Sequence, residues 1–173
     1  MAIDLEFFIT RFSANAEAIE RLLKDIDEPC AKWKPAEDKW SILEVVCHLV
    51  DEERLDFRMR LDHLLHKPDV EWPPVDPHAW VVEHGYSGKD VREQLLLFLA
   101  ERYQSIEWLG SLQSPDWNTF RTHAKLGDIT AGSMLGSWLA HDYLHLRQLS
   151  NLYLGYLKQQ VHPHSLNYAD PRL

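Results

Sequence analysis

The sequence lacks the features that would place it among several large classes of protein. It has only two cysteines in 173 residues, Cys30 and Cys47, which leaves little for a disulfide scaffold and suits a reduced, cytoplasmic setting. No run approaches the ~18 uninterrupted apolar residues that suggest a membrane helix. The first residues carry acids where a secretory signal needs a basic start and an apolar run. We therefore expect a cytoplasmic protein with no membrane partner.

Positive charge is also scarce. The chain has 18 Lys and Arg against 27 Asp and Glu, a formal net charge of −9, and its acids are spread along the whole length. Nucleic-acid backbones are bound by clustered Lys and Arg, which are missing here. This balance argues against a nucleic-acid partner and favours a small molecule.

Internal repeats, Gly/Ser linkers and clear strand patterns are nearly absent as well. What is present is a hydrophobic content of 45% with seven tryptophans. A chain of this size can bury roughly 70% of its unfolded surface in one core. We predict one domain over residues 1–173, in which residues 155–173 form a loosely structured tail.

Apolar residues recur at steps of three and four in four segments, the period of amphipathic helices. The clearest start is "WSILE", where Ser41 can cap the helix and Glu44 can complete a capping box. Trp40, the residue before the cap, can pack on Val45 in the first turn of the helix. The predicted helices run over residues 3–26, from Ser41 to about His66, from a cap at Ser87 to Gly110, and from Asp128 or Thr130 to about Tyr153, before Gly155.

Helices of ~24 residues are ~36 Å long, and four of similar length bury their apolar faces most simply as a bundle. The fold class predicted is therefore all-α, a four-helix bundle. The connections over residues 27–39, 67–86 and 111–129 are longer than the ~2–8 residues that join antiparallel neighbours. At least one of them should cross over the bundle.

The stretch "WLAHDYLHLRQL" places His141 and His145 four residues apart, on one face of a helix. Two such rings can direct nitrogens to a common point ~2.0–2.1 Å from each, as metal ligands do. Two polar side chains on a helix surface are the simpler alternative. Ser137 and Gln148 share this face with apolar residues, which indicates that it points inward. Unpaired buried imidazoles would cost ~1–3 kcal/mol each, a cost that a metal removes.

His48, two turns into the second predicted helix, is the candidate third ligand. Alone it would more often be a hydrogen-bonded core residue; with the pair on the fourth helix, ligation is favoured. Three neutral imidazoles suit Zn²⁺, Ni²⁺ or Fe²⁺ better than Mg²⁺ or Ca²⁺, and leave a position for water or substrate.

Glu52 lies one turn after His48 and is the candidate general base or hydrogen-bond acceptor for the site. The alternative interpretation is that Glu52 is a solvated acid on the surface. Asp51 and Asp142 are the other acids nearby. Asp142 stands where a zinc protease helix has its glutamate, but is rotated ~100° from the metal face, which excludes that class. No Glu-x-x-His repeat supports a di-iron site. The remaining histidines are assigned to the surface: His63, His66, His78, His84, His123, His162 and His164.

Together "WKPAEDKWSILEVVCHLVDEE" and "FRTHAKLGDITAGSMLGSWLAHDYLHLRQL" resemble the DinB-like superfamily over nearly the whole chain. In that family a Trp-Ser helix start leads to a first histidine, and a His-x-x-x-His helix completes a metal site. The resemblance implies that His48, His141 and His145 are the metal ligands. It also implies an up-down-down-up four-helix bundle and commonly a homodimer.

The resemblance does not imply one reaction. Similar proteins are described as metal-dependent hydrolases, and relatives with the same triad are thiol transferases that use bacillithiol or mycothiol, or a thiol-dependent isomerase. A neutral three-histidine set leaves the ion's charge intact, so it can serve either chemistry. We expect a metal-dependent enzyme, a hydrolase or a thiol S-transferase, with a low-molecular-weight thiol among its candidate substrates. The alternative is a non-catalytic helical protein that binds a metal or ligand.

Overall fold

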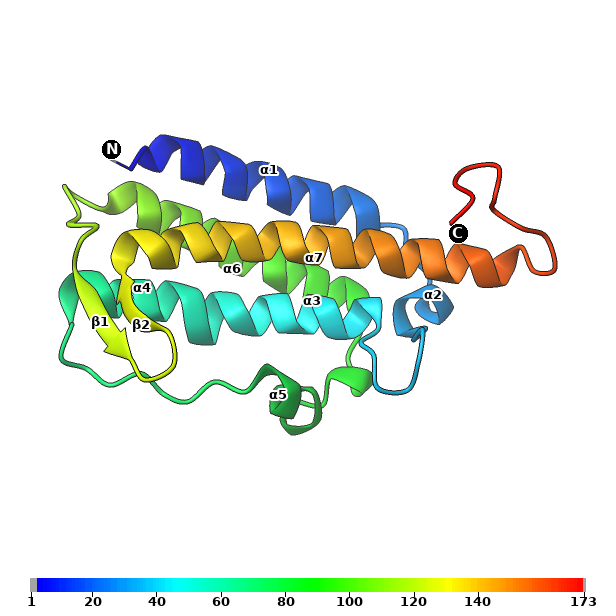
Figure 1. The fold of residues 1–173 in the computed structure, drawn as a ribbon, viewed down its shortest axis with the longest axis horizontal. Helices are drawn as coiled ribbons and strands as arrows, with labels where there is room; N and C mark the ends of the chain where they lie inside the picture. Colours follow the sequence, from blue (N-terminus) through cyan, green and yellow to red (C-terminus); the bar gives the residue numbers. More distant parts are fainter. Residues whose placement is uncertain (1–2, 173) are drawn as a thin grey trace.

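Four long helical segments lie side by side in the computed structural model, which describes residues 3–172 (Figure 1). The second segment is continuous but contains one π-helical turn. The segments are α1 (Leu5–Leu23); α3 (Ile42–Asp51) with the π turn η1 (Glu52–Asp56) and α4 (Phe57–His66); α6 (Val91–Ser111); and α7 (Ala131–Gln160).

The chain direction gives an up-down-down-up bundle. In Figure 1, α3 and α4 run opposite to α1, α6 runs in the same direction as α3 and α4, and α7 returns in the direction of α1. The α3–α4 segment and α6 are consecutive long segments that run in the same direction, so the connection between them must travel the length of the bundle. That connection carries α5 (Pro77–Glu83) and the 3-10 turn η2 (Tyr86–Gly88). The predicted four-helix bundle with a long crossover is confirmed.

Besides α5 and η2, two other short features were not predicted from the sequence. A helix of five residues, α2 (Glu28–Lys32), precedes α3, and an antiparallel hairpin joins β1 (Phe120–His123) to β2 (Gly127–Thr130). The hairpin leads directly into α7, since Thr130 ends β2 and also caps the helix by accepting a bond from the Ser133 amide at 3.0 Å. No helix within residues 3–172 combines the length and apolar character needed to cross a membrane.

The capping box at the start of α3 forms as predicted. The Ser41 hydroxyl accepts from the Glu44 amide at 3.2 Å, and the Glu44 carboxylate accepts from the Ser41 amide at 2.8 Å. The start of α6 was predicted wrongly: Asp90, not Ser87, is the cap, and its carboxylate accepts two amide bonds at 2.9 and 3.0 Å. The end of α6 is at Ser111, one residue after the predicted Gly110.

The predicted end of α7 near Tyr153 is also wrong, because the helix continues through Gly155 to Gln160. A side chain at position 155 would place its Cβ 2.7 Å from the Trp33 ring. Gly155 therefore permits a close aromatic contact and does not stop the helix. Residues 155–160 belong to α7, so the tail that follows is shorter than predicted.

A buried polar cluster joins all four helical segments at the centre of the bundle. The Arg102 guanidinium of α6, 1% exposed, donates to Asp142 of α7 at 2.6 and 2.7 Å and to Glu53 of η1 at 2.6 Å. The Trp138 indole also donates to Glu53, at 2.7 Å, and the Asn15 amide of α1 donates to Asp142 at 3.2 Å. The two carboxylates thus offset the charge of a cation that burial would otherwise destabilise.

The π turn allows two consecutive glutamates to be buried. Glu52 and Glu53 are 5% and 1% exposed, yet they contact different partners. Glu53 binds Arg102 in the central cluster, whereas Glu52 lies beside His48, with 3.6 Å between its Oε1 and the ring Nδ1. π turns are widened single turns within α-helices. Here the turn lies where Glu53 faces the central cluster and Glu52 faces His48.

Replacement of Ser41 by Ala should lower the free energy of unfolding by about 0.5–2 kcal/mol, because the buried Glu44 amide loses its acceptor. Ser87→Ala is the matched control and should change it by less than about 0.5 kcal/mol, since Ser87 caps no helix. Urea denaturation of both variants measures the difference. Equal stabilities of the Ser41→Ala and Ser87→Ala variants would contradict the assigned start of α3.

Replacement of Arg102 by Met should cost about 3–5 kcal/mol of stability, because Glu53 and Asp142 remain buried without their cation. Arg21→Met removes an exposed arginine from α1 and should cost less than about 0.5 kcal/mol. Denaturant midpoints at pH 7 compare the two. A loss for Arg102→Met no larger than that of the control would show that the central cluster contributes no net stability.

Candidate metal centre

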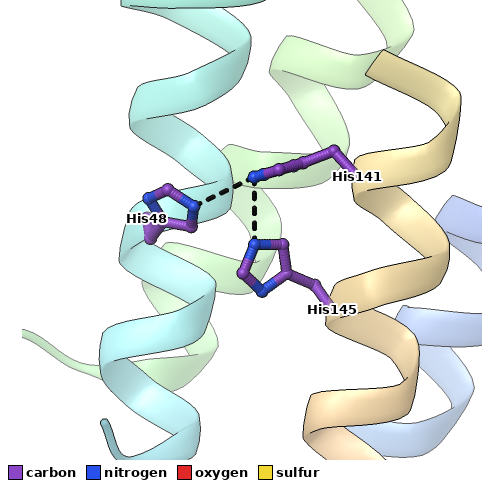
Figure 2. A group of neighbouring side chains, drawn as sticks. All are labelled: His48, His141 and His145. Atoms are coloured by element: carbon purple, nitrogen blue, oxygen red, sulfur yellow. Dashed lines mark hydrogen bonds between the residues drawn. The ribbon is translucent and has the colours of Figure 1, made fainter. Parts of the chain in front are cut away.

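Three histidines from two helices meet at one point between α3 and α7. Figure 2 shows His48 extending from α3 toward His141 and His145 on α7. The Nε2 atom of His141 lies 3.1 Å from Nε2 of His48 and 3.0 Å from Nε2 of His145. His48 and His145 are 3% and 9% exposed, and His141 is half-buried. The structure therefore brings together the three residues that the sequence nominated.

Local sequence explains why the rings converge. The capping box fixes the first residue of α3, and His48 lies on the face of that helix that turns toward α7. On α7, the four-residue spacing stacks His141 and His145 one turn apart. Asp142, next to His141, is tied to the central cluster by Arg102, which sets the rotation of α7 at this level.

Neighbouring side chains orient two of the rings. Nδ1 of His145 lies 2.7 Å from the Gln148 side-chain oxygen, so a proton on Nδ1 is held by that acceptor and Nε2 keeps its lone pair. Nδ1 of His48 makes no hydrogen bond within the described residues. The nearby acid is Glu52, whose Oε1 is 3.6 Å away. A short side-chain movement would let Glu52 accept from this ring.

Burial keeps the three rings neutral. It is the main cause that lowers the pKa of His48 to about 3 and the pKa of His141 to about 2, and neighbouring imidazoles add to the effect. Burial also lowers the pKa of His145. Neutral imidazole is the form that binds transition metals.

The three nitrogens fit a divalent ion better than they fit one another. A neutral ring offers one hydrogen or one lone pair at Nε2. The Nε2 atom of His141 faces two other Nε2 atoms and can donate to one of them only. Tetrahedral ligands ~2.0–2.1 Å from an ion lie ~3.4 Å apart, close to the observed separations. A metal ion would satisfy all three lone pairs together.

Glu52 is buried near the triad, and its surroundings favour the protonated form. Burial is the largest cause that raises its pKa, followed by the charge of Asp56, which itself pairs with Arg60. Asp51, also proposed as a nearby acid, is engaged elsewhere: its carboxylate accepts from the Tyr86 hydroxyl at 2.6 Å. Asp142 is likewise held in the central cluster. Glu52 is the acid that faces the histidines.

The triad lies in the wall of a cavity of about 560 Å³, here called the histidine pocket. Its lining includes Glu52 and Gln148, together with Trp40 and His78. The Trp40 ring centroid is 4.9 Å from that of His48 and 5.5 Å from that of His78. The pocket therefore brings aromatic surface and hydrogen-bonding groups next to the three imidazoles.

Three of the histidines that were assigned to the surface are half-buried: His63, His84 and His123. Nδ1 of His84 lies 2.6 Å from the Asp51 carboxylate. His78 is exposed as expected, but it lines the histidine pocket. It lies on α5, which is too short to show an extended helical pattern, so no signal in the sequence indicated this role.

Comparisons with known proteins agree with this geometry. The solved structure described as "YfiT from Bacillus subtilis is a probable metal-dependent hydrolase with an unusual four-helix bundle topology" is similar to this chain with a TM-score of 0.76. It is 17% identical, and the match covers 87% of this chain and 88% of that one. No curated protein matches the sequence. The family model of the DinB superfamily matches residues 11–149, which contain all three histidines. The chain belongs to the DinB superfamily.

Proposed function

We propose that the protein is a metal-dependent enzyme, a hydrolase or thiol S-transferase, that acts on a small molecule through His48, His141 and His145. The observation that carries the proposal is the convergence of three neutral Nε2 atoms at the wall of a pocket. YfiT, which shares the bundle, is described as a probable metal-dependent hydrolase, and that description supports the proposal.

The number of ligands favours catalysis over a structural metal. Within residues 3–172 the cluster that could hold an ion consists of these three histidines alone. Structural zinc sites usually have four protein ligands, whereas catalytic sites have three and an open position. The histidine pocket adjoins this open side, so a substrate has space to approach.

Each neighbouring residue has a separate task in the proposed reaction. A bound ion would supply positive charge that polarises a substrate or stabilises an anion. Gln148 holds the proton of His145 at Nδ1 and so directs Nε2 into the site. Glu52 carries a proton beside the pocket and can exchange it with substrate. Trp40 and His78 line the histidine pocket and present aromatic surface to a substrate.

Purified protein should contain about one divalent transition metal per chain, and His145→Ala should lose most of it. His66→Ala changes an exposed histidine of α4 and should retain the metal. Elemental analysis of the three proteins measures the content. Because burial lowers the pKa of all three histidines, the wild type should keep its ion at pH 6 and release it only in much stronger acid, where protons compete for the ligand nitrogens. Full metal content in His145→Ala would overturn the triad.

Replacement of Glu52 by Gln should leave metal binding intact and reduce turnover by about 100-fold or more, if Glu52 transfers a proton. The assay is a screen of ester hydrolysis and of thiol transfer, with Glu107→Gln, an exposed acid of α6, as the control. Wild-type rates in Glu52→Gln would exclude a role in proton transfer.

Cobalt-substituted protein tests whether the coordination sphere is open. Glutathione added to this protein should give a sulfur-to-metal charge-transfer band in both the wild type and Glu52→Gln. A cobalt spectrum that neither thiols nor carboxylates perturb would mean a closed site. The non-catalytic alternative would then replace the enzyme.

A further inference from the structure

A second pocket opens beside the histidine pocket. Its volume is about 550 Å³, and it is called here the Trp33 pocket after the side chain that forms part of its wall. Lys39, Trp40 and Gln148 line both pockets. Because three side chains are shared, the two cavities form adjoining parts of one cleft. Gln148 also contacts His145, so one residue links the cleft's two halves to the triad.

The Trp33 pocket has a largely apolar wall. Trp33 and Trp40, from the segment between α2 and α3, lie across from Leu144 and Leu152 of α7. Trp33 is held in place by its contact with Gly155 and by an edge-on contact with Tyr156, with 5.9 Å between ring centroids. A fixed aromatic wall of this kind favours a ligand with an aromatic or branched apolar body.

Positive charge lies at the rim of this pocket. Lys39 is paired with Asp38 at 2.9 Å, but Arg147 forms no ion pair with any carboxylate of residues 3–172. Arg147 is exposed on α7, where its guanidinium can reach a ligand. Because Arg147 lines the pocket and is not occupied by a carboxylate of the described chain, it can bind an anionic group of a ligand there. Its planar fork can bind a carboxylate through two parallel hydrogen bonds.

The spacing along α7 sets the length of the ligand. His145 lines the histidine pocket, and Asn151 lines the Trp33 pocket six residues later. At 1.5 Å per residue this separation is ~9 Å along the helix axis. An elongated molecule of that length can have its reactive end at the triad and its apolar body beside Asn151, which lies one helical turn from Arg147.

We propose that the substrate is an elongated apolar carboxylate: its aromatic or branched body occupies the Trp33 pocket, its carboxylate binds Arg147, and its reactive end lies at the three histidines. The position of the reactive end rests on the proposed function. The binding of the carboxylate does not, because the Trp33 pocket has no metal ligand among its lining residues.

Calorimetric titration of metal-free protein with biphenyl-4-carboxylate tests the carboxylate site. The acid should bind once per chain, and Arg147→Gln should weaken it by about fivefold. Biphenyl-4-carboxamide should bind more weakly than the acid and should be insensitive to Arg147→Gln. Lys158→Gln, which removes an equal charge from the exposed end of α7, should leave the acid's affinity unchanged. Equal binding of acid and amide, or no effect of Arg147→Gln, would overturn the proposal.

A second variant tests the position of the apolar body. Asn151 is exposed and lines only the Trp33 pocket, so Asn151→Trp should fill the cavity without disturbing the fold or the metal content. Binding of both acid and amide should then be lost. Wild-type affinity in a folded Asn151→Trp protein would place the ligand elsewhere and overturn the proposal.

A thiol extension of the same probe separates this inference from the proposed function. 4′-(Mercaptomethyl)biphenyl-4-carboxylate should change the spectrum of cobalt-substituted protein, and Arg147→Gln should raise the concentration needed. An unchanged cobalt spectrum, with Arg147-dependent calorimetric binding intact, would overturn the proposed function and still support the carboxylate site. Loss of the Arg147 dependence alone, with a normal cobalt response, would overturn the carboxylate site and leave the metal function standing.

Discussion

The buried guanidinium of Arg102 is the constraint on which the rest of the bundle depends. A cation removed from water must be paired, and its partners Glu53 and Asp142 come from two other helical segments, while Asn15 brings in the fourth. Apolar faces alone tolerate small rotations and shifts, but charged hydrogen bonds of 2.6–2.7 Å do not. Asp142 directly follows His141, so the interaction that fixes the helices also fixes the histidine cluster.

The sequence predicted those features that depend on residues close together in the chain. Apolar periodicity located the four helices, and Ser41 with Glu44 located the start of α3. The spacing of His141 and His145 indicated one shared face, and the structure confirms that His48 lies opposite them. The resemblance to the DinB-like superfamily added the order of the helices. Metal ligation itself stays a prediction.

Features set by contacts between distant residues could not be predicted. Gly155 has the sequence signature of a helix end, but its role depends on Trp33, more than a hundred residues earlier. The partners of Arg102 could not be predicted either, since no local pattern identifies Glu53 or Asp142. The crossover helix α5 is too short to show a period, so the position of His78 beside the triad was not visible.

The π turn at Glu52–Asp56 has a consequence for how insertions and deletions affect this fold. A π turn holds one more residue than the α turn it replaces, so α3 and α4 differ in phase although they share an axis. Loss of one residue here would restore a uniform helix and rotate everything after it by ~100° relative to His48. Leu61 and Leu64, both buried, would then leave the core. The length of this segment is therefore as strictly constrained as the identity of its residues.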